Sequence, residues 1–154
     1  MSRRSLVRFC SAVFVPAVMA VAVYAATPQE AQKARHEHYE HLGDAFKAVR
    51  DNTRGGNPDW AVVEKSAQTV VDASVDQQKW FAEGTGPEAG KTRALPEIWS
   101  KPDDFAAAAK MFEEKSAALL AAAKTKDVDA VNKAFRDAGG SCKNCHDTFR
   151  APEE

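Results

Sequence analysis

The chain has 154 residues, 44% of them apolar, with 21 basic and 22 acidic side chains and a formal net charge of −1. This length favours a single domain, and the balanced charge fits neither a basic nucleic-acid-binding protein nor an acidic disordered chain. Three cysteines are too few for a disulfide scaffold. We therefore expect one helical globular domain that does not bind nucleic acid.

Residues 1–25 have the pattern of a secretory signal peptide. Three arginines among the first eight residues precede an uncharged, mostly apolar run over 9–24, and small residues follow. A membrane anchor is the alternative, but the run is shorter than the roughly 20 residues of a spanning helix and Pro16 interrupts it. We predict cleavage after Ala25, with Ala26 as the alternative, and a periplasmic protein that is free of the membrane afterwards.

Four helices are predicted in the remaining residues, 26–154. The first covers about 28–50, with Arg35, Tyr39, Leu42 and Phe46 on one face. A Gly-Gly turn precedes the second helix, predicted over 59–81. Residues 83–102 contain three glycines and three prolines and predict a long loop, in which Trp99 and its apolar neighbours pack back onto the helices.

The last two helices are predicted over 103–124 and 127–150, with a tight reversal between them. Each has an apolar face at helical spacing, and no segment alternates as a strand would. We therefore predict an all-α fold, an antiparallel up-down four-helix bundle.

The segment Cys142-Lys143-Asn144-Cys145-His146 has the spacing of a c-type haem attachment motif. Thiols three residues apart lie on one helix face, where both can reach the vinyl groups of one porphyrin edge. His146 then follows as the axial iron ligand. We therefore predict one covalently bound haem c.

The two cysteines have three alternative uses. A thioredoxin-like redox pair needs a βαβ context, which the sequence does not predict. A zinc site would need further ligands, for which His36, His38 and His41 are candidates. A simple disulfide is the third alternative. Export, the trailing histidine and the lack of any other cysteine after residue 25 favour haem.

Beyond the motif, the chain resembles the class II c-type cytochromes, most closely cytochromes c′. Three features carry the resemblance: the motif lies near the C-terminus, the first helix contains the segment 35–43, and the loop contains 81–99. The resemblance covers essentially all of residues 26–154. It implies a four-helix bundle with one haem, a periplasmic location and, in many members, a homodimer.

The resemblance also implies what covers the open side of the iron. In the low-spin branch of the family a methionine of the first helix is the sixth ligand, and in cytochromes c′ an apolar or aromatic residue takes its place. Here that position is Tyr39, and the one methionine after residue 25 is Met111. We expect Tyr39 to be a lid over five-coordinate iron; phenolate ligation, which needs a strongly lowered pKa, is the alternative.

Other site residues also follow from the resemblance. Arg35 is expected to meet a haem propionate, Phe81 to line the distal pocket, Phe149 to pack against the porphyrin or the core, and Arg150 to lie beside the proximal face, one turn after His146. His36 is expected at the haem edge. His38 and His41 are expected to face solvent, with His38 as a rival sixth ligand if the helix register differs.

The predicted function is binding of small gases, NO and CO, at five-coordinate iron, together with one-electron redox. The alternative is a six-coordinate, low-spin electron carrier. Peroxidase-like catalysis ranks last because no distal acid–base histidine is predicted, so we do not expect an enzyme. The sequence does not identify a redox partner protein.

Overall fold

The computed structural model describes residues 26–152, so the predicted signal peptide lies outside the described residues. Four long helices make up most of it: α1 (Pro28–Thr53), α2 (Trp60–Ser74), α4 (Pro102–Thr125) and α5 (Val128–Phe149). The short segments η1 (Gln77–Trp80), η2 (Pro87–Ala89) and α3 (Glu97–Ser100) lie between α2 and α4. Between residues 26 and 152 the only β-pairing is an isolated bridge between Ala94 and Arg150.

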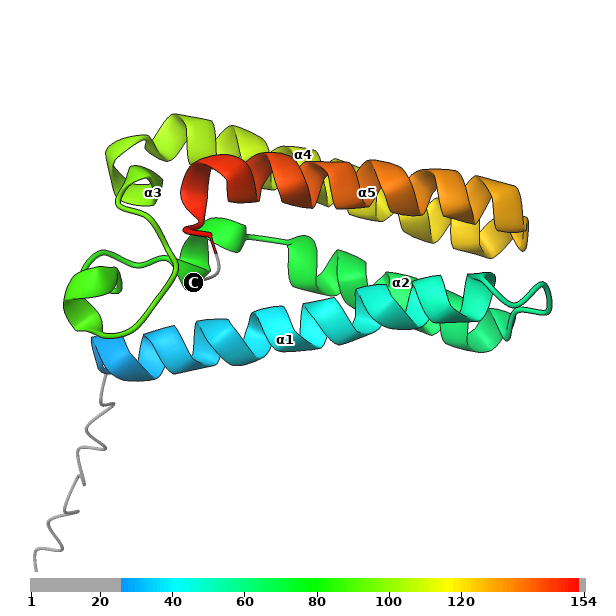
Figure 1. Ribbon diagram of the computed structural model, residues 1–154, viewed down its shortest axis with the longest axis horizontal. Coiled ribbons are helices and arrows are strands. Elements are labelled where there is room, and N and C mark those ends of the chain that lie inside the picture. The colour runs from blue at the N-terminus through cyan, green and yellow to red at the C-terminus, as the bar shows by residue number, and fades with distance from the viewer. Residues whose placement is uncertain (1–25, 153–154) are drawn as a thin grey trace, which may run out of the picture.

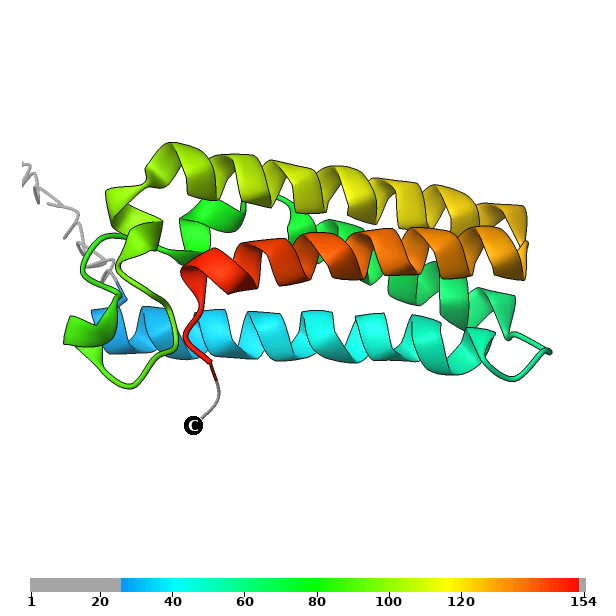
Figure 2. The same ribbon diagram turned by 45° about the horizontal axis from the view of Figure 1, so that its top comes forward.

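The four long helices run antiparallel in sequence order, as Figure 1 shows, so the predicted up-down bundle is confirmed. α1 packs against α2 and α5, and α4 packs against the same two helices. The start of α1, the end of α5 and the segments η1, η2 and α3 gather at one end (Figures 1 and 2). No helix within residues 26–152 is long and apolar enough to cross a membrane.

Side-chain caps explain where three of the helices begin. Thr27 and Glu30 form a reciprocal capping box at the start of α1, with Pro28 in its first turn. The carboxylates of Asp59 and Asp127 accept backbone N–H bonds at the starts of α2 and α5. Each cap satisfies donors that the first helical turn leaves without partners.

The prediction of one continuous helix over 59–81 is wrong. α2 ends at Ser74, Val75 is extended, and Asp76 has a φ of 52° in the left-handed region before η1 begins. Neither glycine nor proline marks this break, and aspartate is one of the few other residue types that tolerates the left-handed region. Ser74 and Gln78 keep helical spacing across the break, so the sequence pattern does not reveal where α2 ends.

Residues 83–102 are not a featureless loop, because they contain η2 and α3. The predicted packing is confirmed: Ile98 is buried, and the indole N–H of Trp99 donates to the carbonyl of Phe81 at 2.9 Å. Ile98 joins Phe105, Ala108 and Phe149 in a small apolar cluster at this end of the bundle. A larger cluster fills the space between the four long helices.

Candidate haem site

The two cysteines of the motif lie on α5, three residues apart, so both face the same side of the helix. Both are free thiols and half-buried. Cys142 packs against the central cluster of the bundle, and Cys145 against the smaller one. Burial raises the pKa of both thiols, that of Cys145 to about 11. The motif thus places two protonated thiols along the inner side of α5.

His146 lies on the last turn of α5 and keeps solvent exposure. Partial burial lowers its pKa, and the positive charges of Arg150 and Arg93 lower it further, while Asp147 opposes them. Neutral imidazole is the form that ligates a metal. The local field therefore favours the ligating form of His146.

Tyr39 of α1 faces the two thiols from across the bundle. Its pKa is raised, mainly by burial and also by the proximity of Cys145 and Cys142, with Arg35 acting in the opposite direction. The ring centroids of Tyr39 and Phe81 are 6.1 Å apart. A protonated phenol and an aromatic ring therefore stand opposite the attachment motif.

Phe81 and Phe149 are linked through Phe105 of α4. The centroids of Phe81 and Phe105 are 5.0 Å apart, and those of Phe105 and Phe149 are 5.2 Å apart, both edge-on. Edge-to-face pairs at this distance are favourable. Phe149 is buried in this cluster, so the expectation that it packs in the core is consistent with the structure.

Arg35 is only 5% exposed and joins α1 to the segment that follows α2. Its Nη1 donates to the Trp80 carbonyl at 3.2 Å and to the Thr85 hydroxyl at 3.0 Å. Its Nη2 donates to the Thr85 carbonyl at 2.9 Å and to the Thr92 hydroxyl at 3.3 Å. These four bonds match the four N–H groups of the terminal nitrogens, and Nε–H has no hydrogen bond of its own to the described residues.

Arg150 lies one turn after His146, just beyond the end of α5. α5 ends at Phe149, and Arg150 is an extended C-cap residue whose N–H donates to the His146 carbonyl at 3.1 Å. The loop holds the chain extended at this point: Leu95 N–H donates to the Phe149 carbonyl at 3.0 Å, and Ala94 and Arg150 form the β-bridge. Arg150 is exposed and close enough to His146 to lower its pKa, although it does not continue the helical face.

The expectation that His38 faces solvent is wrong. Its ring stacks on Trp80 with the centroids 4.1 Å apart, and its Nε2 lies 3.0 Å from the Ala73 carbonyl oxygen. The break after Ser74 brings Trp80 and the end of α2 over this part of α1. His36 and His41 are exposed, and Nε2 of His36 lies 3.3 Å from Oε1 of Glu40.

Two residues of the site were missed by sequence reasoning. Gln77 is 4% exposed and accepts a hydrogen bond from the Tyr39 hydroxyl, while its own amide donates to the Ala73 carbonyl. Thr85 is buried and holds Arg35. Thr85 lies between two glycines in the loop segment 81–99, and this pattern could have marked it as a site residue. Nothing in the sequence pairs Gln77 with Tyr39.

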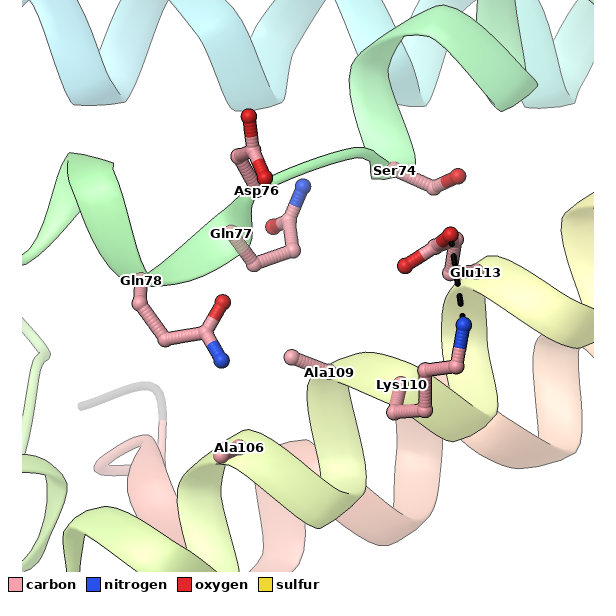
Figure 3. A pocket seen from close by; sticks show the side chains of 8 residues that line it. All are labelled: Ser74, Asp76, Gln77, Gln78, Ala106, Ala109, Lys110 and Glu113. Atoms are coloured by element: carbon pink, nitrogen blue, oxygen red, sulfur yellow. Dashed lines mark hydrogen bonds and ion pairs between the residues drawn. The ribbon is translucent and has the colours of Figure 1, made fainter.

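A shallow pocket lies between the end of α2, η1 and α4, and Figure 3 shows the eight side chains that line it. Lys110 and Glu113 pair across 3.4 Å at its rim. None of the motif residues lines this pocket. Gln77 lines it and also contacts Tyr39, so η1 separates the pocket from the site.

The rival uses of the cysteines find no support in the described residues. No group of three or more His, Cys, Asp or Glu side chains gathers there in a way that could hold a metal ion. Cys142 and Cys145 are not bonded to each other. No βαβ unit occurs within residues 26–152.

Comparison with known proteins agrees with this site. Residues 30–150 match the family model described as Cytochrome C'. The chain belongs to the cytochrome c′ family. It is 33% identical over 125 residues to cytochrome c′ of Alcaligenes xylosoxydans xylosoxydans, covering 81% of this chain and 96% of that one. It is 34% identical over 125 residues to cytochrome c′ of Pararhodospirillum photometricum, covering 81% and 99%.

Solved cytochromes c′ have the same fold. One described as showing "an unusual ligand-controlled dimer dissociation" has a TM-score of 0.77 at 28% identity, covering 84% of this chain and all of that one. The nitric oxide complex of an Alcaligenes xylosoxidans variant has a TM-score of 0.75 at 30% identity, with 84% and 100% coverage. A carbon monoxide complex from the same organism has a TM-score of 0.73 at 30% identity, with 82% and 98% coverage.

The protein is therefore a haem c cytochrome with one covalently attached haem in a four-helix bundle. Its residues fit this cofactor. Two free thiols and an imidazole biased towards its neutral form lie together on α5. The indole N–H of Trp80 is buried and has no hydrogen-bond partner among the described residues, so a donor is available for a buried acceptor.

Proposed function

We propose that this chain is a periplasmic mono-haem cytochrome whose iron has His146 as its protein ligand, leaves the opposite side without one, and binds NO and CO. The observation that carries the proposal is the state of Tyr39. Its hydroxyl donates to Gln77 and its pKa is raised above the ordinary value, so it is held as a neutral phenol. A neutral phenol is a poor iron ligand, which leaves Tyr39 as a lid.

Each residue of the site has a role in this proposal. Cys142 and Cys145 form the two thioether bonds, and Arg150 lies beside the His146 side of the iron. Bound haem supplies an iron centre that takes up small gases and exchanges one electron. Phe81 contributes an aromatic ring next to Tyr39, and Phe149 belongs to the buried apolar cluster against which Phe81 packs.

We further propose that Arg35 positions a haem propionate. Its terminal nitrogens are held by carbonyl and hydroxyl groups of the loop, which fixes the guanidinium while leaving Nε–H available. The Trp80 indole N–H, which is buried and has no hydrogen-bond partner among the described residues, belongs to the residue whose carbonyl accepts from Arg35, and we propose it as a second donor. Charge-assisted bonds of this kind to carboxylates are strong.

The low-spin alternative requires a sixth ligand, and the candidate residues are either exposed or bonded elsewhere. Met111 lies on α4 and is 43% exposed. His38 is engaged with Ala73 and Trp80, and His36 is exposed. We therefore do not propose the electron carrier as a second function, although one-electron redox remains part of the first.

Relatives support the choice of ligand. Solved cytochromes c′ of similar fold include a nitric oxide complex and a carbon monoxide complex. A solved cytochrome c′ described by its ligand-controlled dimer dissociation supports the proposal that this chain forms a homodimer. We propose no catalytic activity and no particular redox partner.

The decisive experiment is the absorption spectrum of the exported haem protein in the ferric state, the ferrous state and the ferrous state under CO. We expect high-spin, five-coordinate spectra that change when CO is added. A low-spin spectrum that CO does not alter would overturn the proposal.

Two variants test the position of Tyr39. By resemblance to the low-spin branch of the family, Tyr39→Met supplies a sixth ligand and converts the spectrum to low spin. Tyr39→Leu is the matched control and leaves the iron five-coordinate. A Tyr39→Met protein that stays high-spin would show that Tyr39 does not lie over the iron.

A further inference from the structure

We propose that Gln77 is the latch that holds the Tyr39 lid closed, so that it sets the rate at which a gas reaches the iron. This inference rests on the proposed function, because it takes Tyr39 as the residue a ligand must displace. The side chain of Gln77 hydrogen-bonds Tyr39 and the Ala73 carbonyl, so it acts through Tyr39 and is a positioning residue.

The latch originates in the break after α2. Had the helix continued, the Ala73 carbonyl would have accepted the backbone N–H of Gln77 four residues later. The helix instead ends at Ser74, and Asp76 takes a left-handed conformation. The side-chain amide of Gln77 now donates to that carbonyl in place of its backbone N–H.

This first bond fixes the second. With its nitrogen committed to Ala73, the Gln77 amide presents its oxygen in one direction, and the Tyr39 hydroxyl donates to it. Gln77 is 4% exposed, so water does not readily replace either bond. His38, the residue before Tyr39, also approaches the Ala73 carbonyl at 3.0 Å, which holds the same turn of α1 against the end of α2.

A chain of hydrogen bonds therefore runs from Ala73 through Gln77 to Tyr39. A tyrosine that swings aside for a ligand must leave the Gln77 oxygen, because that oxygen is anchored and cannot follow. The closed lid thus has one hydrogen bond more than the open lid. An aliphatic lid at the same position would have no hydroxyl for such a bond.

The test measures CO association with the ferrous haem protein for the wild type, Gln77→Leu, Tyr39→Phe and the double variant. Each single variant deletes the same hydrogen bond from one side, so each should accelerate association about tenfold, the effect of one net hydrogen bond. The double variant should be no faster than the faster single variant, because the bond can be lost only once.

Gln78→Leu is the matched control. Gln78 is the adjacent exposed glutamine, and its side chain leaves η1 in a different direction from that of Gln77 (Figure 3). It should associate with CO at the wild-type rate. Tyr39→Phe also keeps the proposal testable if Gln77→Leu folds poorly, since it leaves the amide of Gln77 and its bond to Ala73 in place.

A second readout needs no added gas. In a chain cleaved after Ala25, Tyr39 is the one tyrosine. The tyrosine doublet in ultraviolet resonance Raman spectra reports whether a phenol hydroxyl donates a hydrogen bond, and it should change in Gln77→Leu but not in Gln78→Leu.

The possible failures can be separated. If the wild type binds no CO, the proposed function fails before the latch is tested by kinetics. If the wild type binds CO but Gln77→Leu and Tyr39→Phe associate at its rate, the gas-binding function stands and the latch is refuted. Additive accelerations in the double variant would also refute it.

Discussion

The guanidinium carbon of Arg35 lies 4.7 Å from the centroid of the Phe81 ring, which joins the first helix to the first residue after η1. The cation rests on an aromatic face while its nitrogens hold Thr85 and Thr92. One buried side chain therefore connects α1 to the long segment between α2 and α4. Removing it should affect the loop as well as any propionate contact.

We predict that Arg35→Leu lowers the free energy of unfolding of the haem protein by about 3 kcal/mol, because buried and part-buried carbonyl and hydroxyl acceptors lose their donors. Arg35→Lys should recover only part of the loss, since an ammonium cannot reproduce the fork of a guanidinium. Urea unfolding measures both. Lys33→Met, on the exposed side of α1, is the control and should change stability by less than about 0.5 kcal/mol. A fully stable Arg35→Lys protein would contradict this role.

Cys142→Ser and Cys145→Ser each remove one thiol of the attachment motif. Each single variant should keep haem through the remaining thioether at reduced yield, and the double variant should lose all covalent haem. Haem staining after denaturing electrophoresis, together with the haemochrome spectrum, distinguishes these outcomes. Asn144→Ser, between the two cysteines on an exposed position, should stain like the wild type. Haem that survives denaturation in the double variant would rule out attachment through these thiols.

His38 should make stability depend on pH. Burial lowers its pKa, and Lys79 and His41 lower it further, against the effect of the Ala73 carbonyl. A histidine with a lowered folded-state pKa takes up its proton more readily when unfolded. Its stabilising effect is therefore complete above the unfolded pKa of about 6.5 and is lost as pH falls below that value towards the folded pKa.

The measurement is the free energy of unfolding between pH 7 and pH 5 for the wild type, His38→Gln and His41→Gln. The decline towards pH 5 should be shallower in His38→Gln. His41 is exposed on the same helix and is the smallest of the causes that lower the pKa of His38, so His41→Gln should keep most of the wild-type decline. Parallel curves for the wild type and His38→Gln would show that His38 does not contribute.

Gly43 offers a way to stabilise the bundle. It lies inside α1, and a Cβ placed there would meet no other atom within 4 Å. Gly43→Ala should therefore raise the free energy of unfolding by about 1 kcal/mol, through the lower backbone entropy of alanine. Gly56 has equally open surroundings but a φ of 72°, so Gly56→Ala should destabilise instead.

Thermal unfolding at two protein concentrations checks both glycine variants. A gain for Gly43→Ala that disappears at high concentration would place Gly43 at a subunit contact, which the added methyl group disturbs. A lower melting temperature for Gly43→Ala at both concentrations would contradict the prediction for that variant.

The sequence alone determined the bundle and the cofactor. Helical periodicity and capping residues depend on neighbours within a few positions, and so does the pairing of Cys142 with Cys145 and His146. The early part of α1 and the loop segment around Thr85 also carry enough pattern to indicate the family. These features are local, so the order of residues suffices to predict them.

Only the tertiary structure decided how the far side of the site is built. The end of α2 at Ser74 carries no local mark, and the pairing of Gln77 with Tyr39 joins residues 38 positions apart. The contact of His38 with Trp80 and the hold of Thr85 on Arg35 likewise depend on how α1 packs against the chain after α2. Such contacts depend on the distances that remain after the helices pack, and no periodicity along the chain encodes those distances.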